Sequence, residues 1–118
     1  MLLTRMLTEA RGCRILTEVF SKRGYPIEAD VDFDEAGISF VIDGWCAASR
    51  IGFEYRTHAA ADKVDLDDDE IRRLGEEMEK GRFFIFVIDE DDVGSADDLA
   101  LYANAFIDEV ERRRGGQR

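Results

Sequence analysis

The chain has 118 residues, of which 45% are hydrophobic and 36% charged, so it holds enough apolar material for one core and too much for a disordered tail. Its 16 basic and 27 acidic side chains give a formal net charge of −11, which opposes binding to nucleic acid and anionic membranes unless the cations gather on one face. The sequence lacks a transmembrane run of roughly 18 apolar residues and the continuous apolar stretch of a signal peptide, so we expect a cytoplasmic protein.

Two cysteines, Cys13 and Cys46, fall in separate predicted elements and lack the spacing of metal ligands. A disulfide between them is unusual in a reducing compartment, and cysteine is common in protein interiors. We therefore expect both side chains to be small buried hydrophobic groups.

The first segment, which ends near residue 20, has the pattern of an amphipathic helix. Its apolar residues recur at three- and four-residue steps, with charged residues and threonines between them. They are Leu3, Met6, Leu7, Ala10, Cys13, Leu16, Val19 and Phe20. Gly24 supplies a C-terminal stop, and Pro26 prevents the helix from continuing.

From residue 27 the hydrophobic period changes from that of a helix to that of a strand. In IEADVDF, residues 27–33, apolar side chains alternate with acids, which predicts a strand wetted on one side. The expected apolar face consists of Ile27, Ala29, Val31 and Phe33. The turn DEAG, residues 34–37, then returns the chain, and ISFVID, residues 38–43, is predicted as the antiparallel partner.

A loop at residues 44–50 leads to a third predicted strand, IGFEYRT, at residues 51–57. Because side chains alternate along a strand, Glu54 and Arg56 emerge on the same side, together with Gly52. The opposite face carries the apolar residues Ile51, Phe53 and Tyr55.

The acidic segment DLDDDE, residues 65–70, predicts the start of a second helix. Asp67 followed by Glu70 forms a capping box, and acidic residues favour the positive end of the helix dipole. The buried stripe of this helix is expected to consist of Ile71, Leu74 and Met78, and Gly81 ends the helix.

The run RFFIFVID, residues 82–89, has six consecutive apolar residues between charges, which is typical of a strand buried on both faces. The acids of DEDDVGS, residues 89–95, form either a solvated loop or a cation site at the end of that strand. Ser95 with Asp98 forms a second capping box, ahead of a last helix. Its apolar stripe is Leu99, Tyr102, Ala103, Phe106, Ile107 and Val110.

The predicted order is therefore α-β-β-β-α-β-α. It indicates a single α/β domain, bordering on α+β, at residues 1–114, followed by a frayed tail at residues 115–118. We expect a mixed four-stranded sheet flanked by helices, in which the first three strands form a meander. The third and fourth strands flank a helical crossover and should run parallel.

This order resembles the restriction-endonuclease-like PD-(D/E)XK superfamily over residues 3–89, with an aspartate near the end of the second strand and Glu-x-Arg on the third. The resemblance implies that Asp43 and Glu54 bind Mg²⁺. It places Arg56 where the family has a lysine that orients or activates the attacking water. Two hard oxygen ligands on adjacent strands suit Mg²⁺, because they leave coordination positions for water and phosphate.

The resemblance also implies a carboxylate on the first helix, for which Glu18 is the first candidate and Glu9 the second. The chain departs from the family pattern in two ways. Arg56 is always protonated and cannot act as a general base, although it can clamp a phosphate. Asp43 also lacks the preceding proline of the family motif, because Ile42 stands there.

Simpler interpretations of the same residues remain open. Asp43 lies next to a glycine, where aspartate commonly bonds to backbone amides in turns. Glu54 could form an ion pair with Arg56 or across the strands. His58, the only histidine, is expected in a solvated loop. Trp45 could cover a pocket, present an interaction surface or pack under the hairpin.

Two functions follow from these observations. The acidic charge and the missing lysine favour a small binding or interaction module without efficient catalysis, which binds a basic protein partner or mimics nucleic acid. A nucleic-acid partner is disfavoured but stays open, and a membrane partner is not expected. The alternative is a divergent Mg²⁺-dependent phosphodiesterase or nuclease that uses Asp43, Glu54, Arg56 and Glu18.

Overall fold

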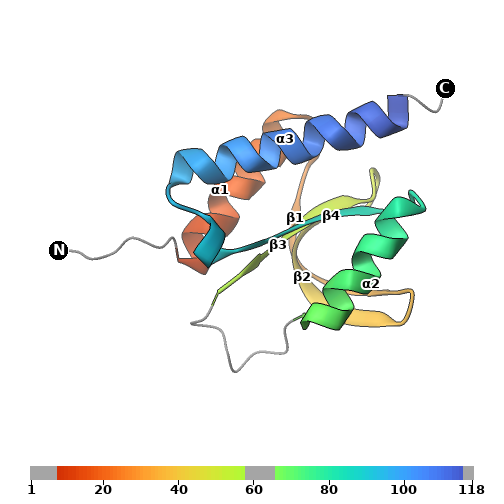
Figure 1. Ribbon diagram of the computed structural model, residues 1–118. Coiled ribbons are helices and arrows are strands. Elements are labelled where there is room, and N and C mark those ends of the chain that lie inside the picture. The colour runs from red at the N-terminus through yellow and green to blue at the C-terminus, as the bar shows by residue number, and fades with distance from the viewer. Residues whose placement is uncertain (1–7, 58–65, 116–118) are drawn as a thin grey trace.

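The computed structural model describes residues 8–57 and 66–115, which form an α+β domain with three α-helices and a mixed four-stranded sheet. The helices are α1 (Glu9–Lys22), α2 (Asp68–Glu79) and α3 (Ala96–Gly115). The strands are β1 (Glu28–Glu35), β2 (Ile38–Cys46), β3 (Ile51–Arg56) and β4 (Phe84–Asp89), and a 3₁₀ turn, η2, follows at Glu90–Asp92. Figure 1 shows α1 and α3 on one side of the sheet and α2 on the other. The predicted order of elements is confirmed.

The strands lie in the order β1-β2-β3-β4. The pairs β1–β2 and β2–β3 are antiparallel, and β3–β4 is parallel, with α2 as the crossover between them. Both the predicted meander and the predicted parallel pair are therefore confirmed. The turn between β1 and β2 has positive φ at Ala36 (58°) and Gly37 (76°), which is the geometry of a tight two-residue hairpin turn.

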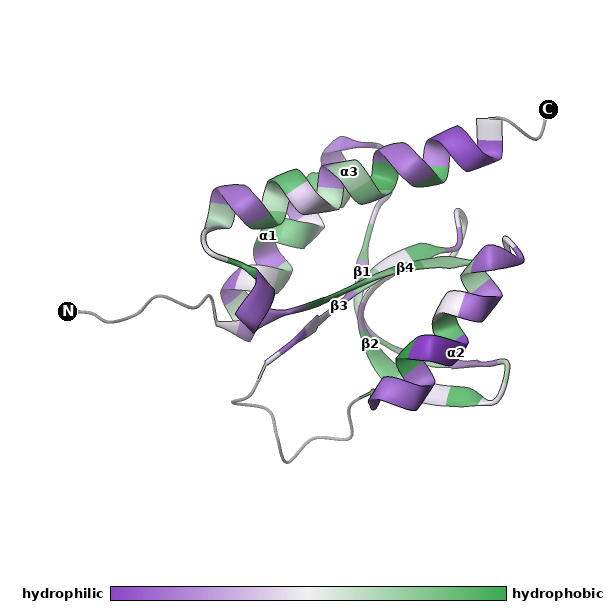
Figure 2. Ribbon diagram, in the orientation of Figure 1, coloured by the Kyte–Doolittle hydropathy of each residue, from purple (hydrophilic) through white to green (hydrophobic). Residues whose placement is uncertain are grey.

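The core consists of two clusters, one on each face of the sheet. The cluster under α1 and α3 contains Leu16, Phe20, Ile51, Phe53, Tyr55, Leu99 and Ile107, and the cluster under α2 contains Phe33, Ile38, Phe40, Ile42, Trp45, Leu74 and Ile85. Successive residues of β4 alternate between them, because Phe84 belongs to the first cluster and Ile85 to the second. The prediction that this strand is buried on both faces is confirmed. Figure 2 shows hydrophobic residues along the strands and in bands on the helices.

The helices α2 and α3 begin where the sequence predicts, whereas α1 begins later than its apolar pattern suggested. Asp67 and Glu70 form the capping box at the start of α2, and Ser95 accepts a hydrogen bond from the Asp98 N–H at the start of α3. In α1, Thr8 is the N-cap and accepts from the Arg11 N–H, so the described helix starts at residue 9. The apolar residues predicted upstream of Thr8 lie outside the described residues.

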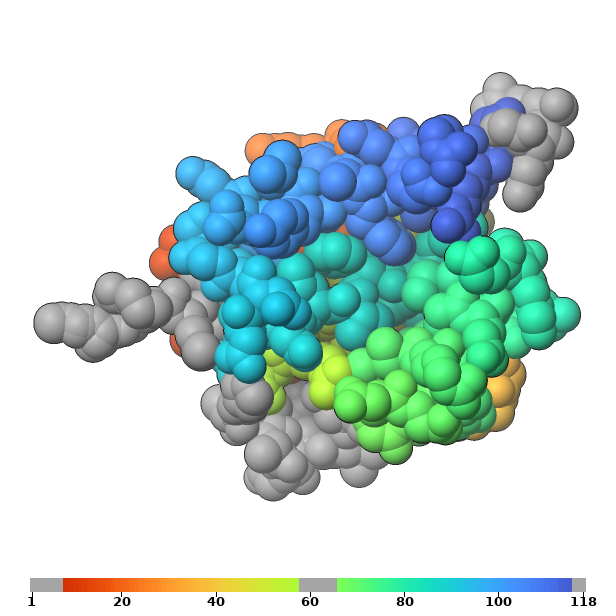
Figure 3. Space-filling model, viewed as in Figure 1, coloured from red at the N-terminus to blue at the C-terminus, as the bar shows by residue number. Residues whose placement is uncertain are grey.

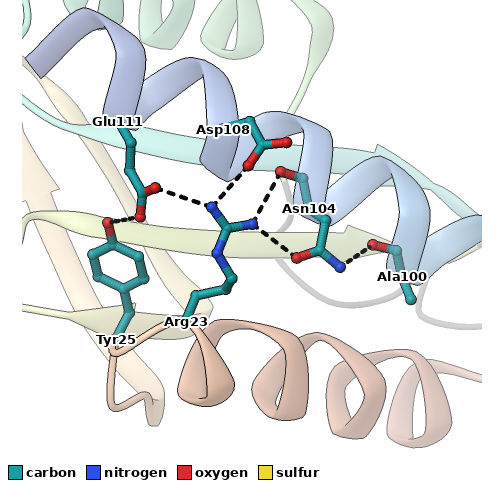
Figure 4. Close-up of polar contacts among 6 residues, drawn as sticks. All are labelled: Arg23, Tyr25, Ala100, Asn104, Asp108 and Glu111. Carbon is teal, nitrogen blue, oxygen red and sulfur yellow. Dashed lines mark hydrogen bonds and ion pairs between the residues drawn. The ribbon is translucent and has the colours of Figure 1, made fainter. Parts of the chain in front are cut away.

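A polar cluster joins the end of α1 to the outer side of α3 (Figure 4). Arg23 donates to the side chains of Asn104 (2.9 Å), Asp108 (2.8 Å) and Glu111 (3.0 Å), and the Tyr25 hydroxyl donates to the other oxygen of Glu111 (2.7 Å). These contacts connect the C-terminal end of α1 to α3.

Three details of the predictions are wrong. Ile27 packs in the cluster under α1 and α3, whereas Val31 and Phe33 pack under α2, because Asp30 between them has a left-handed backbone (φ 53°) that interrupts the alternation. The second strand continues to Cys46 rather than ending at residue 43, because its last residues pair with β3. The last helix extends to residue 115, which the sequence assigned to the frayed tail.

Candidate functional site

The candidate site lies where β2 and β3 separate. The two strands pair through their backbones only at residues 44–46 of β2. Two glycines show how little space the strands leave there. A Cβ atom added to Gly52 would lie 2.3 Å from the Gly44 carbonyl oxygen, and one added to Gly44 would lie 2.3 Å from the Phe53 ring. Only glycine permits such an approach at these two positions. The backbone ladder stops directly beyond this contact.

At the next position the strands are joined by side chains. The Asp43 N–H donates to Oε1 of Glu54 (2.9 Å), and the Tyr55 N–H donates to Oδ2 of Asp43 (2.8 Å). Each carboxylate thus accepts a backbone hydrogen bond from the opposite strand, and we call this pair the carboxylate bridge. Both residues are buried, with 7% of Asp43 and 5% of Glu54 exposed. These hydrogen bonds offset part of the cost of burying two polar side chains.

Asp43 also lines a pocket at the N-terminal end of α1. Its volume is about 320 Å³, and Glu9, Asp30 and Asp43 line it together with Ala10, Cys13 and Ala29. We call it the acidic pocket. The left-handed backbone at Asp30 places this residue beside the pocket, and aspartate tolerates that conformation better than most residues.

The surroundings of Cys13 in the acidic pocket disfavour the thiolate form. Burial raises the pKa of its thiol well above the ordinary value, and the nearby Asp43 and Glu9 carboxylates raise it further. The thiolate is the reactive form of cysteine, so a side chain held as the neutral thiol is inert. Cys46 is buried, as expected, and Cys13 is partly buried.

Arg56 points toward the start of α2. Its Nε lies 3.2 Å from Oδ1 of Asp89, which is directly opposite on β4, and its Nη1 lies 3.9 Å from Oδ1 of Asp68. The ion pairs of Arg56 are therefore with Asp89 and Asp68, and the pair between Glu54 and Arg56 that the sequence left open is not among them.

The structure brings some of the predicted site residues together and not others. Asp43 and Glu54 are neighbours, as the resemblance implies. Glu18 is exposed on α1 and is not among the residues that line the acidic pocket, whereas Glu9, the second candidate, is. His58 lies outside the described residues. Trp45 packs under the hairpin, edge-on to Phe33 (5.3 Å between ring centres).

Asp30 was missed by the sequence analysis. The alternating pattern assigned it to the wet face of an ordinary strand, and nothing in the spacing signals its unusual backbone. Across residues 8–57 and 66–115, no three or more histidine, cysteine, aspartate or glutamate side chains are arranged to hold a metal ion. The acids after β4 form the short turn η2, in which Glu90 is buried.

Comparisons with protein-family models, with curated proteins and with solved structures find no match to this chain. Within the described part of the chain, no helix is long and apolar enough to cross a membrane.

Proposed function

We propose that this domain is a binding module for a basic protein segment, and that the acidic pocket accepts a cationic side chain of the partner. In this proposal the carboxylate bridge holds β2 to β3 and does not hydrolyse phosphodiesters. The strand order agrees with the restriction-endonuclease-like arrangement that the sequence resembles, and we infer that the domain uses this arrangement as a scaffold. A shared fold does not carry function with it.

The observation that carries the proposal is the way in which the predicted catalytic side chains are engaged. One oxygen of Asp43 and one of Glu54 accept backbone N–H groups across the strands, and the guanidinium of Arg56 contacts Asp89 and Asp68. Each of these contacts stabilises the fold. Arginine also cannot take a proton from an attacking water.

The charge of the site supports a cationic ligand. Three carboxylates line the acidic pocket, and the whole chain has a formal net charge of −11. A phosphate group entering this pocket would be repelled, whereas a lysine or arginine side chain would be attracted and could donate to the carboxylates. The volume of about 320 Å³ is large enough for the end of such a side chain.

Titration of the ¹⁵N-labelled protein with a lysine- and arginine-rich peptide tests this proposal. We expect shifts of the amides around Glu9, Asp30 and Asp43, and binding that weakens as salt is added. Asp30→Asn should weaken binding at least about threefold while preserving the left-handed backbone, which asparagine also adopts. The matched control is Asp32→Asn, an exposed position on β1 that does not line the pocket. Equal weakening by both substitutions would show that binding depends on overall charge alone, and would refute the pocket.

A second candidate is a divergent Mg²⁺-dependent phosphodiesterase, favoured by the proximity of Asp43 and Glu54 and by the position of Glu9 in the same pocket as Asp43. Mg²⁺ is often held by only one or two carboxylates plus water and substrate phosphate. In that case the oxygens of Asp43 and Glu54 would hold the ion.

A nuclease assay with Mg²⁺ or Mn²⁺ separates the two candidates. We expect no useful cleavage by the unaltered protein, and Arg56→Lys is the substitution best suited to reveal latent activity, because it restores the family pattern. Cleavage that is lost in Glu54→Gln would establish the second candidate. Glu54→Gln is the suitable blank, since the amide keeps an oxygen for the Asp43 N–H.

A further inference from the structure

A second pocket lies between α2 and α3 beside the start of β4, and we call it the apolar pocket. Its volume is about 220 Å³, and it shares no lining residue with the acidic pocket. Its apolar walls consist of Gly75 and Met78 of α2, Phe84 of β4, and Phe106 and Val110 of α3. In Figure 3, α3 (blue) and α2 (green) lie on either side of β4 at this surface.

Gly75 leaves space in the apolar pocket. It lies in the interior of α2, where glycine is less favourable than any residue other than proline. Its backbone does not have the positive φ of Gly24, Gly37 and Gly81, and a Cβ atom there would meet nothing within 4 Å outside its own stretch of helix. Neither the backbone conformation nor close packing therefore requires glycine at this position. The effect of the missing side chain is to leave the pocket open.

The charged residues that line the apolar pocket are paired with one another. Arg113 of α3 lies 3.0 Å from Glu109 and 3.6 Å from Glu79 of α2, so it joins the two helices. Glu109 also accepts a hydrogen bond from the Nε of Arg112 (3.0 Å). Two arginines thus balance two glutamates, and a charged ligand would have to displace one of these partners.

The cations near the apolar pocket are engaged as well. Arg114 lies over the Phe84 ring (5.0 Å to its centre) and donates to a backbone carbonyl in the loop before β3 (2.6 Å). Lys80 and Arg82 both pair with Glu77. Although the whole chain has a formal net charge of −11, this pocket therefore offers a ligand apolar surface rather than a charge of either sign.

We propose that the apolar pocket binds a small neutral aromatic molecule of one or two rings, and that Gly75 keeps the space for it. An apolar cavity of about 150 Å³ stays dry and takes up benzene, so about 220 Å³ admits two fused rings. It is too small for a drug-sized ligand, which needs about 300 Å³ or more. The rings of Phe84 and Phe106 and the sulfur of Met78 pack favourably against an aromatic ring. This site is independent of the proposed function, because the two pockets share no residue.

Titration of the ¹⁵N-labelled full chain with indole, a neutral molecule of two fused rings, tests this site. We expect a dissociation constant of about 1 mM or lower, with shifts concentrated at the amides of Gly75, Phe84, Phe106 and Val110. Tryptamine and indole-3-acetate carry the same rings with a positive and a negative charge. Each should bind at least about threefold more weakly than indole, because its charged group finds no unpaired partner. Equal or tighter binding of either would overturn the assignment of a neutral ligand.

Gly75→Leu fills the apolar pocket and should raise the dissociation constant for indole at least about tenfold. The matched control, Glu76→Leu, adds the same side chain at the next position of α2, which is exposed and does not line the pocket. It should leave the constant within about twofold of the unaltered protein.

Gly75→Ala keeps the test decisive if the leucine variant does not fold. It should raise the thermal unfolding midpoint, since alanine is the better helix former, and yet weaken indole binding at least about twofold. Opposite changes in stability and binding are not expected of a glycine with a merely structural role. Shifts absent from the pocket amides at millimolar indole, equal effects of Gly75→Leu and Glu76→Leu, or unchanged binding in Gly75→Ala would each overturn the proposal.

Discussion

Two substitutions at Glu54 distinguish a structural carboxylate from a catalytic one. Glu54→Ala removes the acceptor of the buried Asp43 N–H. Leaving a buried donor unsatisfied costs about 1–3 kcal/mol, and the lost methylene of a residue only 5% exposed adds about 0.8 kcal/mol. The unfolding free energy should therefore fall by about 2–4 kcal/mol. Glu54→Gln keeps an oxygen in the same place and loses only the charge assistance, so we expect a loss of about 1 kcal/mol or less.

Urea unfolding followed by tryptophan fluorescence measures both values, because Trp45 is buried in the same strand as Asp43. A constant slope with denaturant would show that the change lies in stability and not in the denatured state. Asp43→Asn provides a companion measurement, since it keeps an acceptor for the Tyr55 N–H. If Glu54→Gln destabilised the protein as much as Glu54→Ala, or if neither substitution moved the urea midpoint, the hydrogen bond to the Asp43 N–H would not contribute to stability. Either result would refute the structural role of Glu54.

Three further predictions concern the scaffold. Gly12→Ala should lower the unfolding free energy, measured by thermal unfolding, by about 1–3 kcal/mol, because the added Cβ would lie 2.7 Å from the Tyr55 ring. In the same assay Gly75→Ala in α2 should raise the unfolding free energy by about 0.5–1 kcal/mol, because a Cβ there has no atom within 4 Å. Arg23→Met should cost about 1 kcal/mol, less at high salt, because it removes the exposed ion pairs that join α1 to α3. Burial and the hydrogen bond to Glu111 raise the pKa of Tyr25 to about 12. The tyrosine of the unfolded chain therefore ionises first, near pH 10, and the unfolding free energy should fall between about pH 10 and 12. Tyr25→Phe should reduce that fall, and Tyr55, whose pKa burial also raises to about 12, should account for the part that remains.

The order and pairing of the elements could be predicted because they depend on local periodicity. Alternation assigned Ile51, Phe53 and Tyr55 to one face of β3, and they share one core cluster. Acids at the start of α2 indicated its N-terminus, and Asp67 caps it. These predictions agree with the structure because each helix or strand buries the face on which its sequence places apolar residues.

The candidate site was predictable only in part, because its geometry depends on contacts between distant segments. The proximity of Asp43 and Glu54 follows from a meander, so the sequence could indicate it. The left-handed backbone at Asp30 and the choice of Glu9 over Glu18 depend on how α1 packs against the sheet. Glu9 and Glu18 both lie on an amphipathic helix, and its periodicity does not say which end meets the pocket.

In the proposed function, the carboxylate bridge accounts for a nuclease-like pattern through its structural role. The backbone pairing of β2 with β3 covers Gly44 to Cys46, and at the next position the Asp43 and Tyr55 N–H groups donate to side chains that reach across. A carboxylate is a stronger acceptor than a side-chain amide, which favours an acid on each strand at this position. Because side chains alternate along β3, Arg56 lies on the same face of the strand as Glu54. The parallel register places Arg56 opposite Asp89 of β4, and the two side chains form an ion pair. An aspartate followed by Glu-x-Arg therefore agrees with a structural junction of strands, and the nuclease assay with Mg²⁺ or Mn²⁺, rather than the pattern itself, decides whether hydrolysis occurs.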